Sequence, residues 1–190
     1  STIMGIEGKF LVRLGDDYLS WNQIQVVWDS GSYDYYGRPV EGKLSNINMT
    51  INANEWSHIA VTFGEKTIKV YVNGVEKGSS TTNVPSSVNF GIAHNDEQGT
   101  RITRCFWVGY SYEHARYFPG MMSELRIWNR VLTADELANA TRRYGVDPKS
   151  EGLVTYWKCD EGQGDVIKDH TSYRNDLASD GLKWEPVSLP

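Results

Sequence analysis

The sequence predicts an all-β fold, a sandwich of two antiparallel sheets with one short helix. Runs that are apolar, or that alternate between apolar and polar residues, fill most of the 190 residues. Turn-forming Gly, Asn, Asp or Ser separates them about every ten residues, a spacing typical of sandwiches and barrels. The predicted strands are Thr2–Ile6, Lys9–Gly15, Gln23–Trp28, Asn46–Ile51, His58–Gly64, Thr67–Val72, Val75–Ser79, Ser87–Ile92, Thr103–Tyr110, Gly120–Asn129, Leu153–Lys158 and Lys183–Val187.

Residues 56–79 carry the strongest strand signal. Large apolar residues occupy the odd positions of Ile59–Phe63 and the even positions of Ile68–Val72, the period of two of a half-buried strand. Glu65-Lys66 forms a tight connection, and Asn73-Gly74 tolerates the positive φ of a type I′ turn. The segment therefore predicts a meander of three strands.

One helix is predicted after residue 132. Thr133 stands three residues before Glu136, which is the spacing of a capping box. Leu137 and Thr141 share one helical face. Gly145 is expected to end the helix because glycine tolerates the left-handed conformation of a C-cap.

Composition excludes two classes of partner. The formal net charge is -5 and no block of like charge occurs, whereas a nucleic-acid-binding surface needs a basic face. No apolar run approaches the length of a membrane helix. Ser1 leads directly into strand-like sequence, so we expect a processed product or a piece of a longer chain, whose compartment no targeting segment reveals.

Motifs for catalysis are missing from the sequence. A retaining glycosidase needs two carboxyl groups about 5 Å apart, and a Glu-x-Asp-x-x-Glu pattern, which would place paired acids on one strand face, does not occur here. Asp160 and Glu161 are adjacent, so in a strand they would point to opposite faces. The histidines lack metal-ligand spacing. We therefore expect no catalytic residues.

Two blocks of sequence carry a resemblance to a known family. One is Glu55–Phe63 followed by Ile68–Gly74, and the other is Phe118–Arg130 running into Leu132–Leu137. In this order they resemble laminin-G-like domains of the concanavalin A-like lectin/glucanase superfamily. The resemblance implies a jelly-roll arrangement of the two sheets, in a single domain over residues 1–190.

A third block, Gly152–Trp157 with Asp160–Gly164 and Asp169, is similar to a segment that often opens such domains, although here it lies late in the chain. Either this segment supplies a missing strand, as in a permuted sandwich, or the chain is the C-terminal part of a longer protein.

The arrangement also resembles the C-terminal domain of surface glycan-binding lipoproteins of gut Bacteroidetes. That resemblance implies a non-catalytic module that binds an oligosaccharide or polysaccharide, in a secreted or cell-surface protein such as an outer-membrane lipoprotein, with a further N-terminal domain upstream. Protein–protein adhesion or scaffolding is the alternative and would require an exposed apolar patch. A glycoside hydrolase is the third reading and would require paired carboxylates in a cleft.

Two loops are expected to hold the ligand-binding residues. Three tyrosines among glycines in Ser30–Arg38 are too many for a core, and tyrosine offers a sugar both a flat apolar face and a hydroxyl. A surface loop without a ligand is the alternative. The candidates in the first loop are Tyr33, Asp34, Tyr35, Tyr36 and Arg38. The candidates in and after the second, His94–Arg104, are His94, Asp96, Tyr110, Tyr112 and His114.

Two further questions stay open in the sequence. Many relatives carry a structural calcium ion, and the acid-rich segments that could supply its oxygen ligands are Asp29–Asp34, Asn95–Glu97 and Asp165–Asp169 with Asn175 and Asp176, although none matches a fixed calcium loop. No other cofactor is expected. Cys105 and Cys159 either form a disulfide, which requires Cα atoms within about 7 Å, or stay as buried free thiols.

Overall fold

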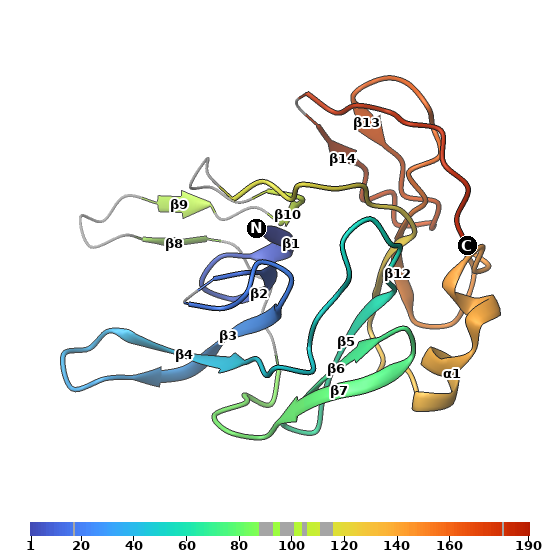
Figure 1. The fold of residues 1–190 in the computed structure, drawn as a ribbon. Helices are drawn as coiled ribbons and strands as arrows, with labels where there is room; N and C mark the ends of the chain where they lie inside the picture. Colours follow the sequence, from blue (N-terminus) through green and yellow to red (C-terminus); the bar gives the residue numbers. More distant parts are fainter. Residues whose placement is uncertain (17, 88–92, 96–100, 104–105, 111–115, 180) are drawn as a thin grey trace. The chain divides into compact units, whose positions relative to one another are not determined.

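The computed structural model describes residues 1–190 except 17, 88–92, 96–100, 104–105, 111–115 and 180 (Figure 1). The chain divides into two compact units. The first unit comprises Ser1–Val72 with Glu76–Pro119, and the second comprises Asn73–Val75 with Gly120–Pro190.

A five-stranded sheet forms most of the first unit, with the strand order β10-β1-β2-β3-β4. Its neighbouring strands pair antiparallel, as the sequence predicts. The strands are β1 (Thr2–Ile6), β2 (Phe10–Leu14), β3 (Ile24–Tyr33), β4 (Pro39–Leu44) and β10 (Trp107–Val108). A separate short pair consists of β8 (Ala93–Asn95) and β9 (Arg101–Thr103).

The core of this sheet lies on β3, whose first five residues are all buried. Trp28 is 1% exposed, and its indole Nε1 donates a hydrogen bond to the Asn83 carbonyl at 2.9 Å. On the paired strand the residue facing Trp28 is Gly42. An ideal Cβ on Gly42 would lie 2.0 Å from the indole Cε2 atom, so only glycine leaves room for this ring.

The predicted meander is confirmed as a three-stranded sheet of β5 (Ile59–Gly64), β6 (Thr67–Val72) and β7 (Val75–Ser80). Asn73 and Gly74 have φ values of 52° and 79°, as a type I′ turn requires. Ile68 and Val70 are fully buried, but Tyr71 on the opposite face is also only 4% exposed. The central strand is thus covered on both faces near Tyr71, whereas Lys69 on the same face stays partly exposed, as its alternating pattern predicts.

The second unit contains β11 (Leu125–Trp128) paired antiparallel with β12 (Leu153–Trp157), and the small pair β13 (Val166–Ile167) and β14 (Leu177–Ala178). The late segment thus supplies a strand partner for Leu125–Trp128. Arg126 forms an ion pair with Glu124, and the Tyr156 hydroxyl donates to Glu124 Oε2 at 2.6 Å. Burial, followed by the hydrogen bond to Glu124, raises the pKa of Tyr156 to about 12, so the hydroxyl keeps its proton.

The predicted capping box is confirmed at helix α1 (Ala134–Ala138). The helix is shorter than the predicted one, which continued to Gly145. Asn139 ends it, because its side-chain oxygen accepts hydrogen bonds from the backbone N–H and the hydroxyl of Thr141. A separate 3-10 turn, Ala140–Arg143, follows.

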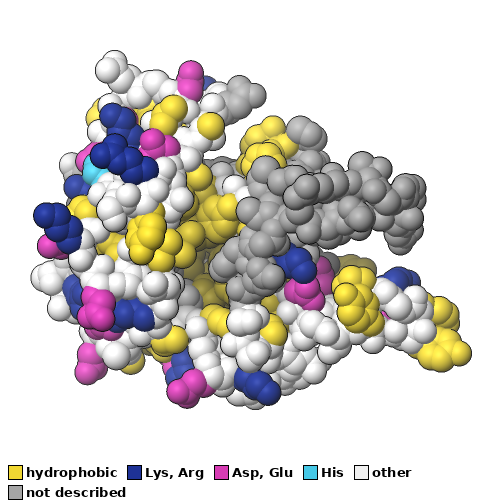
Figure 2. All heavy atoms as spheres, turned by 180° about the vertical axis from the view of Figure 1, so that it is seen from behind, with side chains coloured by type: hydrophobic (Ala, Val, Ile, Leu, Met, Phe, Trp, Pro, Cys, Tyr) yellow, Lys and Arg dark blue, Asp and Glu magenta, His cyan; other side chains and the backbone are white. Residues whose placement is uncertain are grey.

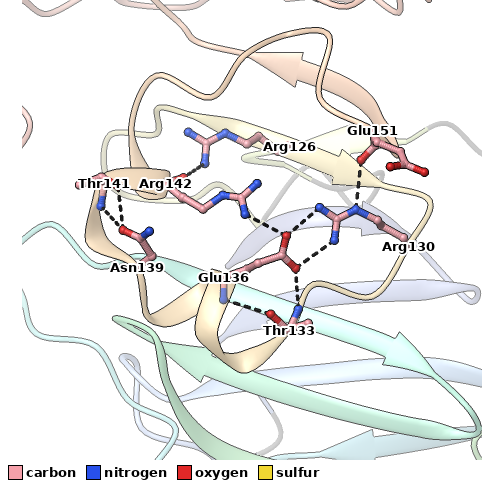
Figure 3. A network of polar contacts seen from close by, with 8 residues as sticks. All are labelled: Arg126, Arg130, Thr133, Glu136, Asn139, Thr141, Arg142 and Glu151. Carbon is pink, nitrogen blue, oxygen red and sulfur yellow. Dashed lines mark hydrogen bonds and ion pairs between the residues drawn. The ribbon is translucent and has the colours of Figure 1, made fainter.

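Glu136 connects this helix to the adjacent strand end (Figure 3). Its carboxylate accepts two hydrogen bonds from the Arg130 guanidinium, at 2.8 and 2.9 Å, and one from Arg142 at 2.9 Å. The backbone N–H of Thr133 donates to the same carboxylate. The Arg130 hydrogen bonds, followed by the one from Thr133, lower the pKa of Glu136 from 4.5 to about 2.

Replacing Glu136 with glutamine is expected to lower the free energy of unfolding by about 1–2 kcal/mol at neutral pH, because a charge-assisted bidentate pair is lost. The folded pKa is depressed, so this stabilisation is present above pH 4.5 and is lost as the pH falls through about 2. Urea unfolding between pH 7 and pH 2 should show the two proteins converging in acid. The exposed, neighbouring Asp135→Asn is the control, and a constant difference at all pH values would contradict the assignment.

Two predicted strands are absent from the described part of the structure. Residues 46–51 form no strand, and Thr50 makes only an isolated bridge to Gln23. Residues 183–187 are also outside regular structure. The predicted strand Ser87–Ile92 falls largely outside the described residues. β3 pairs with β2 on one side and with β4 on the other, and β4 has no counterpart among the predicted strands.

Candidate functional site

The first predicted loop, Ser30–Arg38, is the end of a β-hairpin and not an irregular loop. β3 continues to Tyr33, which pairs with Pro39 at the start of β4. The register shifts between Asp29 and Ser32, and such a bulge bends and twists the hairpin. We call residues 33–38 the hairpin tip.

Asp34 and Arg38 close the hairpin tip. The Asp34 Oδ1 atom accepts hydrogen bonds from the backbone N–H of Tyr36 and of Arg38, both at 2.9 Å, and its Oδ2 atom accepts one from Arg38 Nε at 2.9 Å. The hydrogen bond from the Arg38 backbone leads the interactions that lower the pKa of Asp34. The structure therefore gives these two residues a positioning role, since both carboxylate oxygens are occupied.

The tyrosines of the hairpin tip lie open to solvent. Tyr33 is 69%, Tyr35 96% and Tyr36 76% exposed. The rings of Tyr35 and Tyr36 meet edge to face at 5.3 Å, and the Arg38 guanidinium lies 5.1 Å from the centre of the Tyr36 ring. Figure 2 shows hydrophobic side chains at the free end of this hairpin, at the lower right. Aromatic rings that are exposed to solvent, as these are, can stack on the apolar face of a ligand.

Tyr110 is placed differently from the tyrosines of the hairpin tip. Its ring packs between Trp107, at 5.0 Å and edge to face, and Tyr117, at 4.9 Å. Tyr110 is half-buried, whereas Tyr117 is 63% exposed. The outer ring of this stack thus belongs to Tyr117, which was not among the predicted site residues.

The structure does not bring these two aromatic groups together. β4 and β10 are the two edge strands of the five-stranded sheet. Tyr110 follows β10, where the backbone N–H of Gly109 donates to the Ile3 carbonyl at 2.8 Å. His94 lies in β8, and the predicted site residues Asp96, Tyr112 and His114 lie outside the described residues. Of the two predicted loops, the hairpin tip is therefore the one whose candidate residues are all described and lie together.

Asp160 and Glu161 do converge, contrary to the expectation for adjacent residues in a strand. β12 ends at Trp157 and Cys159 has a φ of 62°, which turns the chain. Their carboxylate oxygens and a ring nitrogen of His170 lie within 4.8 Å of one another. The three side chains could hold a cation, and the histidine would favour a transition metal over calcium.

Oxygen atoms of Asp160 and Glu161 lie within 4.8 Å of each other, close enough for a retaining glycosidase pair, but the Glu161 carboxylate is partly engaged and partly buried. Its Oε1 atom accepts a hydrogen bond from the backbone N–H of Lys168 at 2.8 Å, and its Oε2 atom is buried. The neighbouring Cys159 carries a free thiol, and burial, together with the charges of Glu161 and Asp160, raises its pKa to about 12. Its predicted partner Cys105 lies outside the described residues.

Two of the carboxylates predicted as calcium ligands, those of Asp29 and Asp169, are already engaged. Asp29 pairs with Lys9 at 2.8 Å and accepts a hydrogen bond from Gly31. Asp169 accepts hydrogen bonds from the backbone N–H groups of Tyr156, Thr171 and Asn175, and from the Thr171 hydroxyl. A calcium ion would have to displace these donors, so the calcium site stays a prediction.

On the face that Figure 2 shows, Lys and Arg are interspersed with Asp and Glu among the described residues, rather than gathered by sign. No helix in the described part of the chain is long and apolar enough to cross a membrane.

The second unit also contains a polar hollow whose lining includes Tyr173 and Lys149. The sequence did not predict this hollow, because its lining residues come from three separate segments of the chain.

Comparison with known proteins adds three findings. The family model of the concanavalin A-like lectin/glucanases superfamily matches residues 2–138. The chain is similar in structure to a candidate carbohydrate-binding protein from Bacteroides ovatus, with a TM-score of 0.71 and 27% sequence identity. The alignment covers 100% of this chain and 50% of that protein, so the chain spans half of its length.

An S-layer domain-containing protein from Clostridium thermocellum also matches, at 21% identity and a TM-score of 0.32, over 73% of this chain and 63% of that one. No curated protein matches the sequence.

Proposed function

We propose that this chain, which belongs to the concanavalin A-like lectin/glucanase superfamily, is a non-catalytic glycan-binding module. The antiparallel β fold with one short helix that the sequence predicts agrees with this superfamily. The similarity to a candidate carbohydrate-binding protein supports this proposal. The superfamily also includes glucanases, but in the close carboxylate pair of Asp160 and Glu161 the Glu161 carboxylate is bound by the Lys168 backbone N–H.

The hairpin tip is the observation that carries the proposal. Three exposed tyrosine rings stand on a turn that Asp34 closes with three hydrogen bonds, so little backbone freedom remains to be lost on binding. The apolar face of a tyrosine matches the C–H face of a sugar ring, and its hydroxyl can exchange hydrogen bonds with sugar hydroxyls. We propose Tyr33, Tyr35 and Tyr36 as the ligand-contacting residues.

A secreted or cell-surface location is part of the same proposal, because glycan ligands of this kind are met outside the cell. The proposal of an additional N-terminal domain is compatible with the relative from Bacteroides ovatus, half of which has no counterpart in this chain.

A glycan array followed by calorimetry tests the proposal. Tyr35→Ala and Tyr36→Ala are each expected to weaken binding of the selected glycan about tenfold, the effect of removing one stacked ring. Tyr18 provides the control, because it is another fully exposed tyrosine of the same unit. Its φ of 71° suits asparagine, so Tyr18→Asn should leave affinity unchanged.

Two results would contradict the proposal. The array could give no bound glycan, which would favour the adhesion alternative. Equal affinity of wild type and the Tyr35→Ala, Tyr36→Ala double variant would exclude the hairpin tip as the contact surface.

A further inference from the structure

The second unit contains a hollow of about 420 Å³. Its walls are the end of β11 at Asn129, residues 148–153 before and at the start of β12, and residues 171–173 after β13. This volume lies within the range of about 300–1,000 Å³ found for small-molecule sites. All of its lining residues belong to the second unit, whereas the hairpin tip belongs to the first.

The first wall is held by its own backbone. The N–H groups of Ser150 and Lys149 donate to the carbonyl and to Oδ1 of Asp147, both at 2.9 Å. The backbone N–H of Asn129 donates to the Gly152 carbonyl at 2.8 Å. The side chain of Lys149 therefore starts from a fixed turn.

The second wall is held by Asp169, which is 6% exposed. Its carboxylate accepts the N–H of Thr171 at 2.9 Å and that of Asn175 at 3.0 Å, so both ends of the segment that carries Tyr173 are anchored. Trp157 adds a third anchor, because its Nε1 donates to the Asn175 carbonyl at 2.8 Å. A loop ordered in this way loses little entropy when a ligand binds.

The side chains that face the hollow are mostly unengaged. The ammonium of Lys149, the carboxylate of Glu151 and the hydroxyl of Ser172 have no side-chain hydrogen bond or ion pair within the described part of the chain. Arg130, in contrast, is committed to Glu136 and to the Glu151 carbonyl. Lys149 remains as an uncommitted cation, and the Glu151 carboxylate, which makes no direct ion pair, is attracted to the Arg130 guanidinium, so the two charged side chains leave the hollow without a strong net charge preference.

Tyr173 supplies the aromatic surface of the hollow and is 62% exposed. Its phenol group also lacks a partner among the described residues. A flat apolar ring beside a donor cation, an acceptor carboxylate and hydroxyls matches a ligand with one C–H face and several neutral hydroxyl groups.

The geometry points to this hollow as a binding site for a neutral sugar ring, separate from the hairpin tip. Tyr173 stacks on the C–H face of the sugar, while Lys149 donates to and Glu151 accepts from its hydroxyls. The inference rests on the proposed glycan-binding function and assigns it a second location and a ligand class. Two sites in one chain would add avidity for a polysaccharide that reaches both.

Amide chemical shifts of the ¹⁵N-labelled full chain test the assignment. The probes are the methyl glycosides of glucose, galactose and mannose, N-acetylglucosamine, and glucuronate as a charged comparison. Ligands of this size reach dissociation constants on the order of 1 mM in a formed site. At least one neutral sugar is expected to shift the amides of Lys149–Gly152 and Ser172–Tyr173 in a saturable manner.

Variants then separate stacking from loss of structure. Tyr173→Ala is expected to weaken this binding about tenfold, while Tyr173→Phe, which keeps the ring, stays within about threefold of wild type. Tyr35→Ala should leave the hollow unaffected. Because Tyr173 is largely exposed, its replacement is not expected to unfold the unit.

The failures of the two proposals are distinguishable. Saturable shifts at the hairpin tip without shifts at the hollow would overturn this inference and leave the proposed function standing. Shifts at the hollow alone would support the inference and overturn the hairpin tip. A response to glucuronate alone, or equal binding by wild type and Tyr173→Ala, would also overturn the assignment of a neutral sugar.

Discussion

Replacing Asp169 with alanine is expected to lower the free energy of unfolding by about 3–5 kcal/mol, because a buried anion that satisfies several donors is removed. Three backbone N–H groups and one hydroxyl would lose their acceptor at once. Each buried donor left without a partner costs about 1–3 kcal/mol, and water entering the space offsets part of the sum.

The pH dependence of Asp169 has a definite sign. Burial alone would raise the pKa of this carboxyl, but the hydrogen bonds from Tyr156, Thr171 and Asn175 outweigh burial and lower the pKa. A folded pKa below the unfolded value means that the stabilisation is present above about pH 3.9 and is lost as the pH falls through the folded pKa. Asp169→Asn should therefore flatten the acid limb of the stability profile.

Urea unfolding monitored by circular dichroism measures both effects. Asp165→Ala is the matched control, because Asp165 is an exposed aspartate of the same unit whose backbone carbonyl, and not its side chain, accepts the hydrogen bonds of Ser179. The control should stay within about 0.5 kcal/mol of wild type. If Asp169→Ala unfolds at the same urea concentration as the control, the carboxylate is not a structural anchor.

Local sequence signals predicted those parts of the fold that depend on neighbouring residues. The type I′ turn at Asn73-Gly74 and the capping box of Thr133 and Glu136 are fixed by residues at most three positions apart. The turn geometry follows from backbone sterics, and that of the capping box from two reciprocal hydrogen bonds between Thr133 and Glu136. Such features can be predicted without knowledge of the rest of the chain.

Features that depend on distant partners were harder to predict. β4 begins with a proline and contains Gly42, and both residues are depleted in strands, so its sequence reads as a loop. The glycine is explained only by the Trp28 ring that lies against it across the hairpin. The hollow around Tyr173 likewise combines three segments whose sequences show no common pattern.

The candidate site was predictable in composition and not in the roles of its residues. An excess of exposed tyrosine near residue 35 is visible in the sequence. Only the structure shows that Asp34 and Arg38 close the turn. The Asp34 carboxylate accepts one hydrogen bond from the Tyr36 backbone and two from Arg38. A polar residue beside an aromatic one can contact the ligand or can hold the aromatic ring in place, and spacing alone does not separate the two.

Gly42→Ala is expected to destabilise the first unit by about 3 kcal/mol, at the upper end of the usual cost of overpacking. The added Cβ would lie 2.0, 2.1 and 2.4 Å from three atoms of the Trp28 indole. The ring cannot move away cheaply, because it is buried and its Nε1 is bonded to the Asn83 carbonyl. The strand pair that carries the hairpin tip must shift instead, so we also expect weaker glycan binding.

Gly37→Ala is the control for this substitution. Gly37 lies in the same hairpin with a φ of 75°, and a Cβ there would meet no atom within 4 Å. Its cost is therefore limited to the backbone strain of about 1–2 kcal/mol for a left-handed residue with a side chain. Equal unfolding midpoints for the two alanine variants would show that the indole does not press on the strand.

A double-mutant cycle with Trp28→Phe isolates the clash itself. The smaller phenyl ring lacks the indole atoms that the new Cβ would overlap, so Gly42→Ala should cost at least about 1 kcal/mol less in the Trp28→Phe background than in wild type. Strict additivity would instead assign the cost of Gly42→Ala to the backbone of β4. Favourable coupling would show that the glycine is required by Trp28, and that this packing holds in place the strand pair on which the exposed tyrosines stand.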